Sequence, residues 1–168
     1  MKGKEYCDNH SFSQAGLDGN NELFEYPSDN LRIIDPDMYP MFTSIDKYLP
    51  DGFARMAGAW HAVAINKTMV PQTIKIVTHL DWQDINYGYN TVLPWGNFGG
   101  GNLIFWQAKI IYQVCHGDCL LFMGSVIAHQ VSEIISGMRN SIDLFCHKST
   151  MDWKRRVDVE SGVAHKYT

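Results

Sequence analysis

Two side chains that can bind a metal ion, separated by one intervening residue, follow the end of a predicted strand. Residues 73–78 alternate polar and β-branched side chains, a pattern typical of a β-strand, and His79, Leu80 and Asp81 follow directly. Because residues i and i+2 of a strand point to the same side, His79 and Asp81 would present an imidazole nitrogen and a carboxylate oxygen together. Such a pair is half of a metal site, and this spacing is also common by chance.

His129 is the candidate for a third ligand. It lies in a predicted strand over 127–131, among apolar neighbours, where a histidine is ordinarily a core residue bonded to the backbone. In a barrel, however, residues far apart in sequence meet across paired strands. Two histidines and one carboxylate on one face form the facial triad of non-haem Fe(II) sites, which leaves the opposite coordination positions open. We therefore predict that His79, Asp81 and His129 bind Fe(II).

A candidate anion receptor follows ten residues after His129. Arg139 and Ser141 would share one face of a predicted strand over 139–145. A guanidinium beside a hydroxyl is a good receptor for a carboxylate, because the fork of donors matches its two oxygens. The competing interpretation is a surface arginine at the end of a turn. An arginine that points into a barrel is costly to desolvate without an anion, so the pattern favours a bound dicarboxylate.

The elements that must position these residues are short strands. Turn residues such as Gly99-Gly100-Gly101, His116-Gly117-Asp118 and Ser136-Gly137 separate them. The predicted strands cover residues 60–65, 73–78, 89–93, 102–106, 109–114, 119–123, 127–131 and 139–145. Short strands at this spacing, with almost no helix, predict an antiparallel barrel or sandwich.

The remaining segments show less pattern. The chain of 168 residues fits one compact domain. We expect an irregular N-terminal segment over 1–45, a β domain over 46–150 and a C-terminal tail over 151–168. Ser44 is predicted to cap a short helix over 44–49 that Pro50 ends. The abrupt polar start suggests a fragment of a longer protein.

Composition and charge limit the possible partners. The net charge is −4 and the pI about 5.9, which argues against strong non-specific binding to nucleic acid. The densest cationic run, Lys154 to Arg156, is interpreted as part of a solvated segment. The four cysteines do not suggest a disulfide framework, and Cys115 with Cys119 is a weak zinc motif. No leader or membrane-spanning run is found in the sequence, so we expect an intracellular protein.

The ordered set of metal and anion ligands resembles a known signature. His79-x-Asp81, His129 and Arg139-x-Ser141 are similar to the signature of the 2-oxoglutarate/Fe(II) dioxygenases with a double-stranded β-helix fold. The segments 93–103 and 117–122 resemble the TET/JBP-like branch, especially its divergent fungal members. The resemblance covers about residues 50–150.

This resemblance implies a mainly β, jelly-roll or cupin-like barrel with a few short helices from the N-terminal part. It implies Fe(II) as cofactor, 2-oxoglutarate as co-substrate held through Arg139 and Ser141, and dioxygen as oxidant. The target in that branch is the methyl group of a 5-methylpyrimidine base turned out of the helix. Asp84 falls where the branch carries a polar residue at the base edge, which favours 5-methylcytosine, although Asp84 also suits a turn. Trp82, Tyr87 and Tyr89 are candidates for stacking on a base or for packing alone.

Several alternatives stay open on the sequence. The negative charge and a length shorter than a TET-type catalytic region weigh against a nucleic-acid partner, whether DNA or RNA. A dioxygenase acting on a small molecule or a protein side chain would need the same ligands. A non-catalytic cupin-like module would bind metal without chemistry. If nucleic acid is the substrate, we expect a nuclear location.

Overall fold

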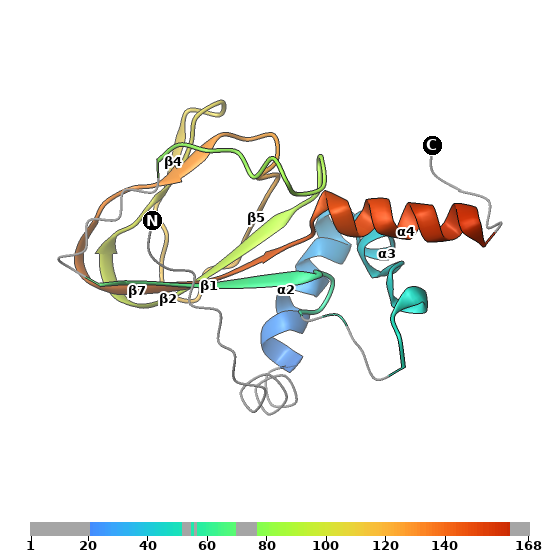
Figure 1. Ribbon diagram of the computed structural model, residues 1–168. Helices are drawn as coiled ribbons and strands as arrows, with labels where there is room; N and C mark the ends of the chain where they lie inside the picture. Colours follow the sequence, from blue (N-terminus) through green and yellow to red (C-terminus); the bar gives the residue numbers. More distant parts are fainter. Residues whose placement is uncertain (1–20, 52–54, 56, 70–76, 162–168) are drawn as a thin grey trace.

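The computed structural model describes residues 21–51, 55, 57–69 and 77–161, which form two facing antiparallel sheets and a group of helices (Figure 1). The four-stranded sheet has the order β1-β7-β2-β5 and the three-stranded sheet the order β4-β3-β6. The strands are β1 (Ala62–Met69), β2 (Asn90–Gly100), β3 (Leu103–Phe105), β4 (Ile110–Tyr112), β5 (Leu120–Phe122), β6 (His129–Val131) and β7 (Ile134–Phe145). Two sheets in this arrangement make a mainly β, jelly-roll barrel, as the sequence predicted.

The two longest strands extend through residues that were expected to form turns. β2 pairs with β7 from Thr91 opposite Leu144 as far as Gly100 opposite Ile134. The turns predicted at Gly99-Gly100-Gly101 and at Ser136-Gly137 are therefore largely wrong. Glycines with positive φ allow the strands to twist and bulge while the pairing continues, with one shift of register between Gly99 and Gly100.

The other predicted strands are close to the observed ones. β3, β4, β5 and β6 lie within the predicted ranges 102–106, 109–114, 119–123 and 127–131, each shorter by two or three residues. The strand expected over 60–65 begins at Ala62 and continues to Met69. The strand expected over 73–78 falls mostly outside the described residues.

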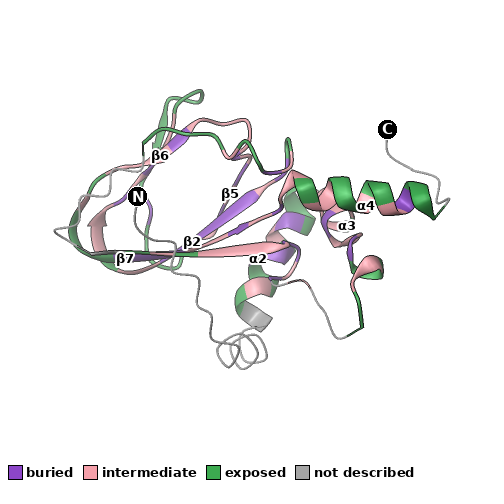
Figure 2. Ribbon diagram, in the orientation of Figure 1, coloured by how far each residue is buried: buried purple, intermediate pink, exposed green. Residues whose placement is uncertain are grey.

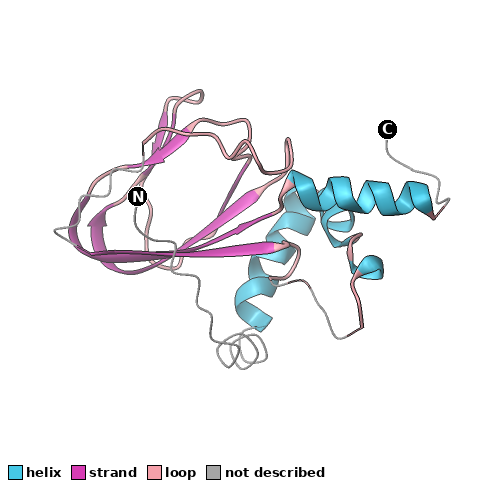
Figure 3. Ribbon diagram, viewed as in Figure 1, coloured by secondary structure: helices cyan, strands magenta, loops and turns pink. Residues whose placement is uncertain are grey.

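Helices are more prominent than expected, and they gather at one end of the strands (Figure 3). α2 (Asn21–Ile34) occupies part of the segment expected to be irregular, and α4 (Lys148–Glu160) begins just before the expected tail and covers much of it. In α2, Phe24, Ser28 and Leu31 recur at helical spacing and face the core, a pattern hidden by the polar residues between them. Within the described residues, no helix combines the length and apolarity needed to cross a bilayer.

The structure also differs from the prediction of a short helix over 44–49 that begins at Ser44. Ser44 ends α3 (Met38–Thr43), and its hydroxyl donates to the Met41 carbonyl at 2.6 Å. A single 3-10 turn, η1 (Asp46–Tyr48), follows without a side-chain cap. Leu49 is extended, as expected for a residue that precedes a proline.

The core has two parts, which lie on opposite faces of the four-stranded sheet. Figure 2 shows buried stretches on α2, which belongs to one part, and on β5, which belongs to the other. Leu93 and Leu144 pack toward the helices, against Trp60 and Phe42. Between the sheets lies a second cluster that contains Val92, Leu103, Val114, Leu120 and Phe122. Both faces of β2 are thus buried near its start.

The cationic run of α4 is only partly solvated. Lys154 is half-buried and donates to Asp158 at 2.7 Å, and Arg155 donates to Asp152 at 3.1 Å. Two of its three charges are therefore paired within the helix, which leaves little of the run for an external anion.

Gly137 offers a test of the close contact between β2 and β7. Its φ is 75°, and a Cβ there would lie 1.9 Å from the Asn97 carbonyl oxygen, whereas Gly117 has a φ of 86° and open space around it. Gly117→Ala should cost about 1 kcal/mol of unfolding free energy, the usual cost of a positive φ. Gly137→Ala should cost roughly 3 kcal/mol or more, because the strands must also separate. Urea denaturation of both variants measures this; equal losses would contradict the close approach.

Candidate functional site

His79 and His129 are brought together by the backbone. The His79 amide donates to the His129 carbonyl at 3.0 Å, and the His129 amide donates to the His79 carbonyl at 3.0 Å. This reciprocal pair forms an isolated antiparallel bridge, so the two side chains leave the sheet at the same point. Their ring centroids lie 4.4 Å apart. The backbone therefore accounts for the meeting of two residues that are fifty positions apart in sequence.

Asp81 completes a cluster of three possible ligands. Its amide donates to the Gly124 carbonyl at 2.9 Å, which fixes the residue beside the histidine pair. Asp81 Oδ1 lies 3.6 Å from His79 Nε2, and Oδ2 lies 3.5 Å from His129 Nε2. The three ligand atoms all lie within 4.8 Å of one another. Neighbouring ligands of an octahedral metal are about 3 Å apart, so small side-chain rotations bring this set to bonding geometry.

Both imidazoles are held in the form that a metal needs. His79 Nδ1 lies 2.8 Å from the Val77 carbonyl and His129 Nδ1 lies 2.9 Å from the Ile127 carbonyl. A carbonyl only accepts, so each Nδ1 carries the proton and each Nε2 keeps its lone pair. Both free nitrogens face Asp81. Two neutral nitrogens and one carboxylate oxygen are a donor set that fits Fe(II).

The two histidines differ in exposure. His129 is buried and packs at the edge of the Phe122 ring, and burial lowers the pKa of its imidazole. His79 has 41% of its side chain exposed. The cluster is therefore anchored on a buried side and open on another, as required for a metal that must also bind exchangeable ligands.

Two residues that the sequence analysis did not select hold the carboxylate of Asp81. Asn90 donates through Nδ2 to Asp81 Oδ2 at 2.7 Å and to Asp84 Oδ2 at 2.9 Å. Gly124 approaches so closely that a Cβ there would lie 2.4 Å from Asp81 Oδ2. In the sequence, Asn90 looked like a strand residue and Gly124 like a turn residue, so neither carried a recognisable signal.

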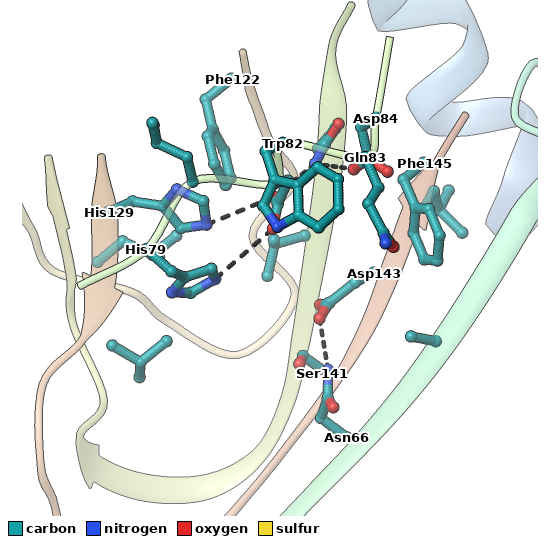
Figure 4. Close-up of a pocket in the computed structure, with 18 of the residues that line it drawn as sticks. Asn66, His79, Trp82, Gln83, Asp84, Phe122, His129, Ser141, Asp143 and Phe145 are labelled. Atoms are coloured by element: carbon teal, nitrogen blue, oxygen red, sulfur yellow. Dashed lines mark hydrogen bonds and ion pairs between the residues drawn. The ribbon is translucent and has the colours of Figure 1, made fainter. Parts of the chain in front are cut away.

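A cavity of about 360 Å³ connects the cluster with Arg139 and Ser141. Figure 4 shows the two histidines on one side of this cavity and Ser141 on β7. β7 contributes Arg139, Ser141 and Asp143 at alternate positions, so all three face the cavity. The four residues His79, Asp81, His129 and Arg139, predicted separately to bind metal and anion, thus line one chamber.

Arg139 is buried and incompletely paired. It is 4% exposed, and neither Nε nor Nη2 has a hydrogen-bond partner among the described residues. Burial lowers the pKa of its guanidinium, and the nearby Asp143 partly offsets this. A Cβ at Gly101 would lie 2.7 Å from Arg139 Cδ, so the absence of a side chain there gives the arginine its space. Unsatisfied donors on a buried cation are costly, and an anionic ligand would satisfy them.

Asp84 is both a turn residue and a buried group of the cavity. Its amide donates to the Asp81 carbonyl at 2.8 Å, which closes a tight turn. Its carboxylate is nevertheless buried, accepts from Asn90 and lies 3.1 Å from His147 Nδ1. Burial raises the pKa of Asp84. The two interpretations of this residue are therefore compatible.

The three aromatic residues that were candidates for stacking on a base differ in their exposure. Trp82 and Tyr87 are 69% and 66% exposed, and Trp82 borders the cavity. Tyr89 packs against the core, and its carbonyl accepts from Trp60 Nε1 at 2.7 Å. Tyr89 is therefore a packing residue, and Trp82 and Tyr87 remain available at the surface.

The possible zinc site at Cys115 and Cys119 has less structural support than the cluster of two histidines and an aspartate. The segment from Cys115 to Cys119 is a turn in which Asp118 accepts from the Cys115 amide at 2.7 Å. Within the described ranges, the cluster of His79, Asp81 and His129 is the one group of at least three potential metal ligands. The zinc interpretation of this turn therefore gains no support.

Fold and site together define a jelly-roll protein with two histidines, a carboxylate and a buried arginine around one cavity. Among solved structures, NgTET1 in complex with 5mC DNA is similar, with a TM-score of 0.70 and 22% identity over 92% of this chain. The chain spans 62% of the length of that structure. A likeness at this identity shows a shared fold.

A structure described as an oxidoreductase of the 2OG-Fe(II) oxygenase family, from Burkholderia pseudomallei, matches 51% of this chain and 43% of that chain. The identity there is 20% and the TM-score 0.44. No protein-family model matches the chain, and no curated protein matches it.

The close approach of Gly124 to Asp81 can be tested by adding one methyl group. Gly124→Ala should displace Asp81 Oδ2 and weaken the affinity for Fe(II) by about 10- to 100-fold, as loss of a supporting contact does in metal sites. Anaerobic titration with Fe(II) measures the affinity, and Gly117→Ala is the matched control because nothing surrounds that position. Unchanged affinity in Gly124→Ala would show that this cluster is not the metal site.

Proposed function

We propose that the protein is an Fe(II)- and 2-oxoglutarate-dependent dioxygenase that hydroxylates the methyl group of a 5-methylpyrimidine in nucleic acid, with 5-methylcytosine favoured. The single observation that carries the proposal is the shared cavity: a cluster suited to Fe(II) faces the same space as a buried arginine, two of whose nitrogens have no partner among the residues that the structure describes. A metal-binding module without a co-substrate has no need of that arginine.

The residues of the chain have separate tasks in this proposal. His79, Asp81 and His129 would hold the iron, with their geometry maintained by Asn90 and by the backbone carbonyls that accept from each Nδ1. Iron with 2-oxoglutarate and dioxygen supplies an oxidant for a C–H bond, while the diacid is converted to succinate and carbon dioxide.

Arg139, with Ser141 beside it on β7, would bind the far carboxylate of 2-oxoglutarate. Both side chains are buried, so their donors act in a medium of low dielectric where an ion pair is strong. The guanidinium also lies over the Phe98 ring, with 5.9 Å between Arg139 Cζ and the ring centroid, a cation–π contact that favours this orientation. A fixed arginine orients the diacid, and the protein packed on the buried side of the cavity limits the access of water to the oxidant from that side.

Asp84 supports the choice of a cytosine base. Its carboxylate faces the cavity and is positioned by Asn90 and His147, so it can accept from the exocyclic amine of cytosine but not from the carbonyl of thymine. The structural likeness to a protein solved with 5mC DNA points the same way. Trp82 and Tyr87 offer exposed rings on which a base or its neighbours would stack. A DNA substrate would place the protein in the nucleus.

The metal and co-substrate assignments are tested together by anaerobic titration. Wild-type protein with Fe(II) and 2-oxoglutarate should show the visible metal-to-ligand absorption band of a chelated 2-keto acid. Arg139→Met should keep Fe(II) affinity and weaken 2-oxoglutarate binding by about 100-fold, the cost of losing hydrogen bonds to a charged group. His79→Ala should lose the band. Metal binding without any band, and no succinate with any substrate, would favour a non-catalytic module.

The assignment of the base is tested by Asp84→Ala. Turnover of oligonucleotides with 5-methylcytosine should fall at least about tenfold, since a buried hydrogen-bond acceptor for the base is lost. The affinities for Fe(II) and 2-oxoglutarate should change little, which separates a contact with the base from damage to Asp81 through Asn90. Product mass analysis on DNA and RNA oligonucleotides measures turnover. Equal turnover in the variant would remove Asp84 from base recognition and favour a small-molecule or protein side-chain substrate.

A further inference from the structure

Asp143 is a carboxyl group of the cavity to which the proposed function gives no task. It follows Arg139 and Ser141 at alternate positions of β7, so the three side chains face the same space. Asn66 of β1 donates through Nδ2 to Asp143 Oδ2, and the Ser141 hydroxyl also donates to this carboxyl group. Figure 4 shows Asp143 and Ser141 on β7 with Asn66 beside them. A hydroxyl has one proton, so Asp143 occupies the only donor of Ser141.

The charge of Asp143 also acts on the arginine. Burial lowers the pKa of the Arg139 guanidinium, and the negative charge of Asp143 partly restores it. Burial raises the pKa of Asp143 to about 6, although the hydrogen bond from Ser141 and the charge of Arg139 favour its ionised form. At neutral pH Asp143 is therefore mostly ionised, and the protein itself supplies an anion next to the proposed receptor for the co-substrate.

The strands on either side of Asp143 contribute no charge to its surroundings. Its partners in the sheet are Ala64 of β1 and Val92 of β2. Across the cavity, the negative charge of Asp81 raises the pKa of Asp143 further. Among the described residues, the charged or titratable groups that line the cavity with it are Arg139 on β7, His79, Asp81 and Asp84 before β2, His129 on β6, and His147 after β7.

A dicarboxylate that binds to Arg139 conflicts with an ionised Asp143 in two ways. It brings a second negative charge into the same site, and two carboxylates that share a site raise the pKa of the one that can take up a proton. It also needs the hydroxyl proton of Ser141, which Asp143 occupies. A neutral Asp143 removes both conflicts. Its own O–H can donate to Ser141 Oγ, and the Ser141 hydroxyl is then free to donate to the dicarboxylate.

We propose that 2-oxoglutarate binds to Arg139 and Ser141 together with one proton from solvent, which neutralises Asp143. This inference rests on the proposed function, since it takes 2-oxoglutarate as the dicarboxylate. The proton is added to a carboxylate oxygen of Asp143, and no other bond forms or breaks. Asp143 is thus a positioning residue: through Ser141 it sets the affinity for the co-substrate and makes that affinity depend on pH.

The direction of the pH dependence follows from the pKa of about 6 that Asp143 has in the free protein. Below this pH the carboxyl group is already neutral, so the affinity for 2-oxoglutarate is highest there. A rise of about one unit in the pKa of Asp143 on binding corresponds, by reciprocity, to an affinity about tenfold lower above about pH 7. The far carboxyl group of 2-oxoglutarate resembles a glutamate side chain and stays ionised throughout this range.

Isothermal titration calorimetry with 2-oxoglutarate, on protein saturated with Fe(II) and without oxygen, measures affinity and proton uptake together. In the wild type the dissociation constant should rise about tenfold between about pH 5.5 and about pH 7.5. Near pH 6.5, buffers of different ionisation enthalpy should reveal uptake of about half a proton per 2-oxoglutarate. Asp143→Asn resembles the neutral carboxyl group, so it should bind about tenfold more tightly than wild type at about pH 7.5, without this uptake.

Two further variants separate this role from a general effect of charge or folding. Asp51→Asn removes an exposed carboxylate outside the cavity and should keep the wild-type affinity, pH profile and proton uptake. Asn66→Ala removes a donor to the ionised form of Asp143, so the pKa of Asp143 should rise and the fall in affinity should move to higher pH. Asn66→Ala decides the question by itself in the event that Asp143→Asn does not fold.

The other outcomes distinguish this inference from the proposed function. Equal or weaker 2-oxoglutarate binding by Asp143→Asn at about pH 7.5 overturns the role of Asp143 while the dioxygenase function stands. Proton uptake that persists in Asp143→Asn assigns the proton to another group and also overturns it. Wild-type protein that binds Fe(II) but shows neither heat of 2-oxoglutarate binding nor the absorption band overturns the proposed function, and this inference with it.

Discussion

The reciprocal pair of backbone hydrogen bonds between His79 and His129 is the interaction on which the site depends. Each bond is 3.0 Å long, and together they hold the two imidazoles at one point. His129 is also paired with Phe105 of β3, which ties this bridge to the three-stranded sheet. Asp81 joins them through a bond to Gly124. The ligand side chains are thus positioned by main-chain geometry, which is stiffer than side-chain packing and tolerates an open face toward solvent.

The cavity combines groups that would be unfavourable in an ordinary core. Arg139 carries donors that find no partner within the described part of the chain, Asp143 is a buried carboxyl, and both are held on β7 between the strands β1 and β2. Burying such groups reduces stability unless a ligand completes their bonds. The surrounding apolar clusters, which pack both faces of β2, supply the compensating stability. The arrangement is typical of a binding site, where buried charged groups lower the stability of the free protein but are kept because they recognise a ligand.

The errors of the sequence-based predictions have physical causes. Glycines 99, 100 and 137 were interpreted as turns because glycine usually marks them, yet the pairing of β2 with β7, ten residue pairs long, runs through these positions. Local signals cannot distinguish a turn from a bulge, since both use positive φ and the difference lies in a distant partner strand. The α2 helix was missed for a similar reason: its buried face has only a few residues, and its contacts with Trp60 and Phe42 come from elsewhere in the chain.

The sequence by itself determined the chemistry that is possible: which side chains can bind a metal or an anion, and the mainly β class that brings alternate residues to one face. It also indicated Arg139, because a cation inside a strand needs a partner. Tertiary structure decided which groups share a space, the tautomer of each imidazole, the support that Asn90 and Gly124 give Asp81, and the entry of Asp143 into the cavity. These depend on through-space distances between residues remote in the chain, and periodicity within a strand carries no information about them.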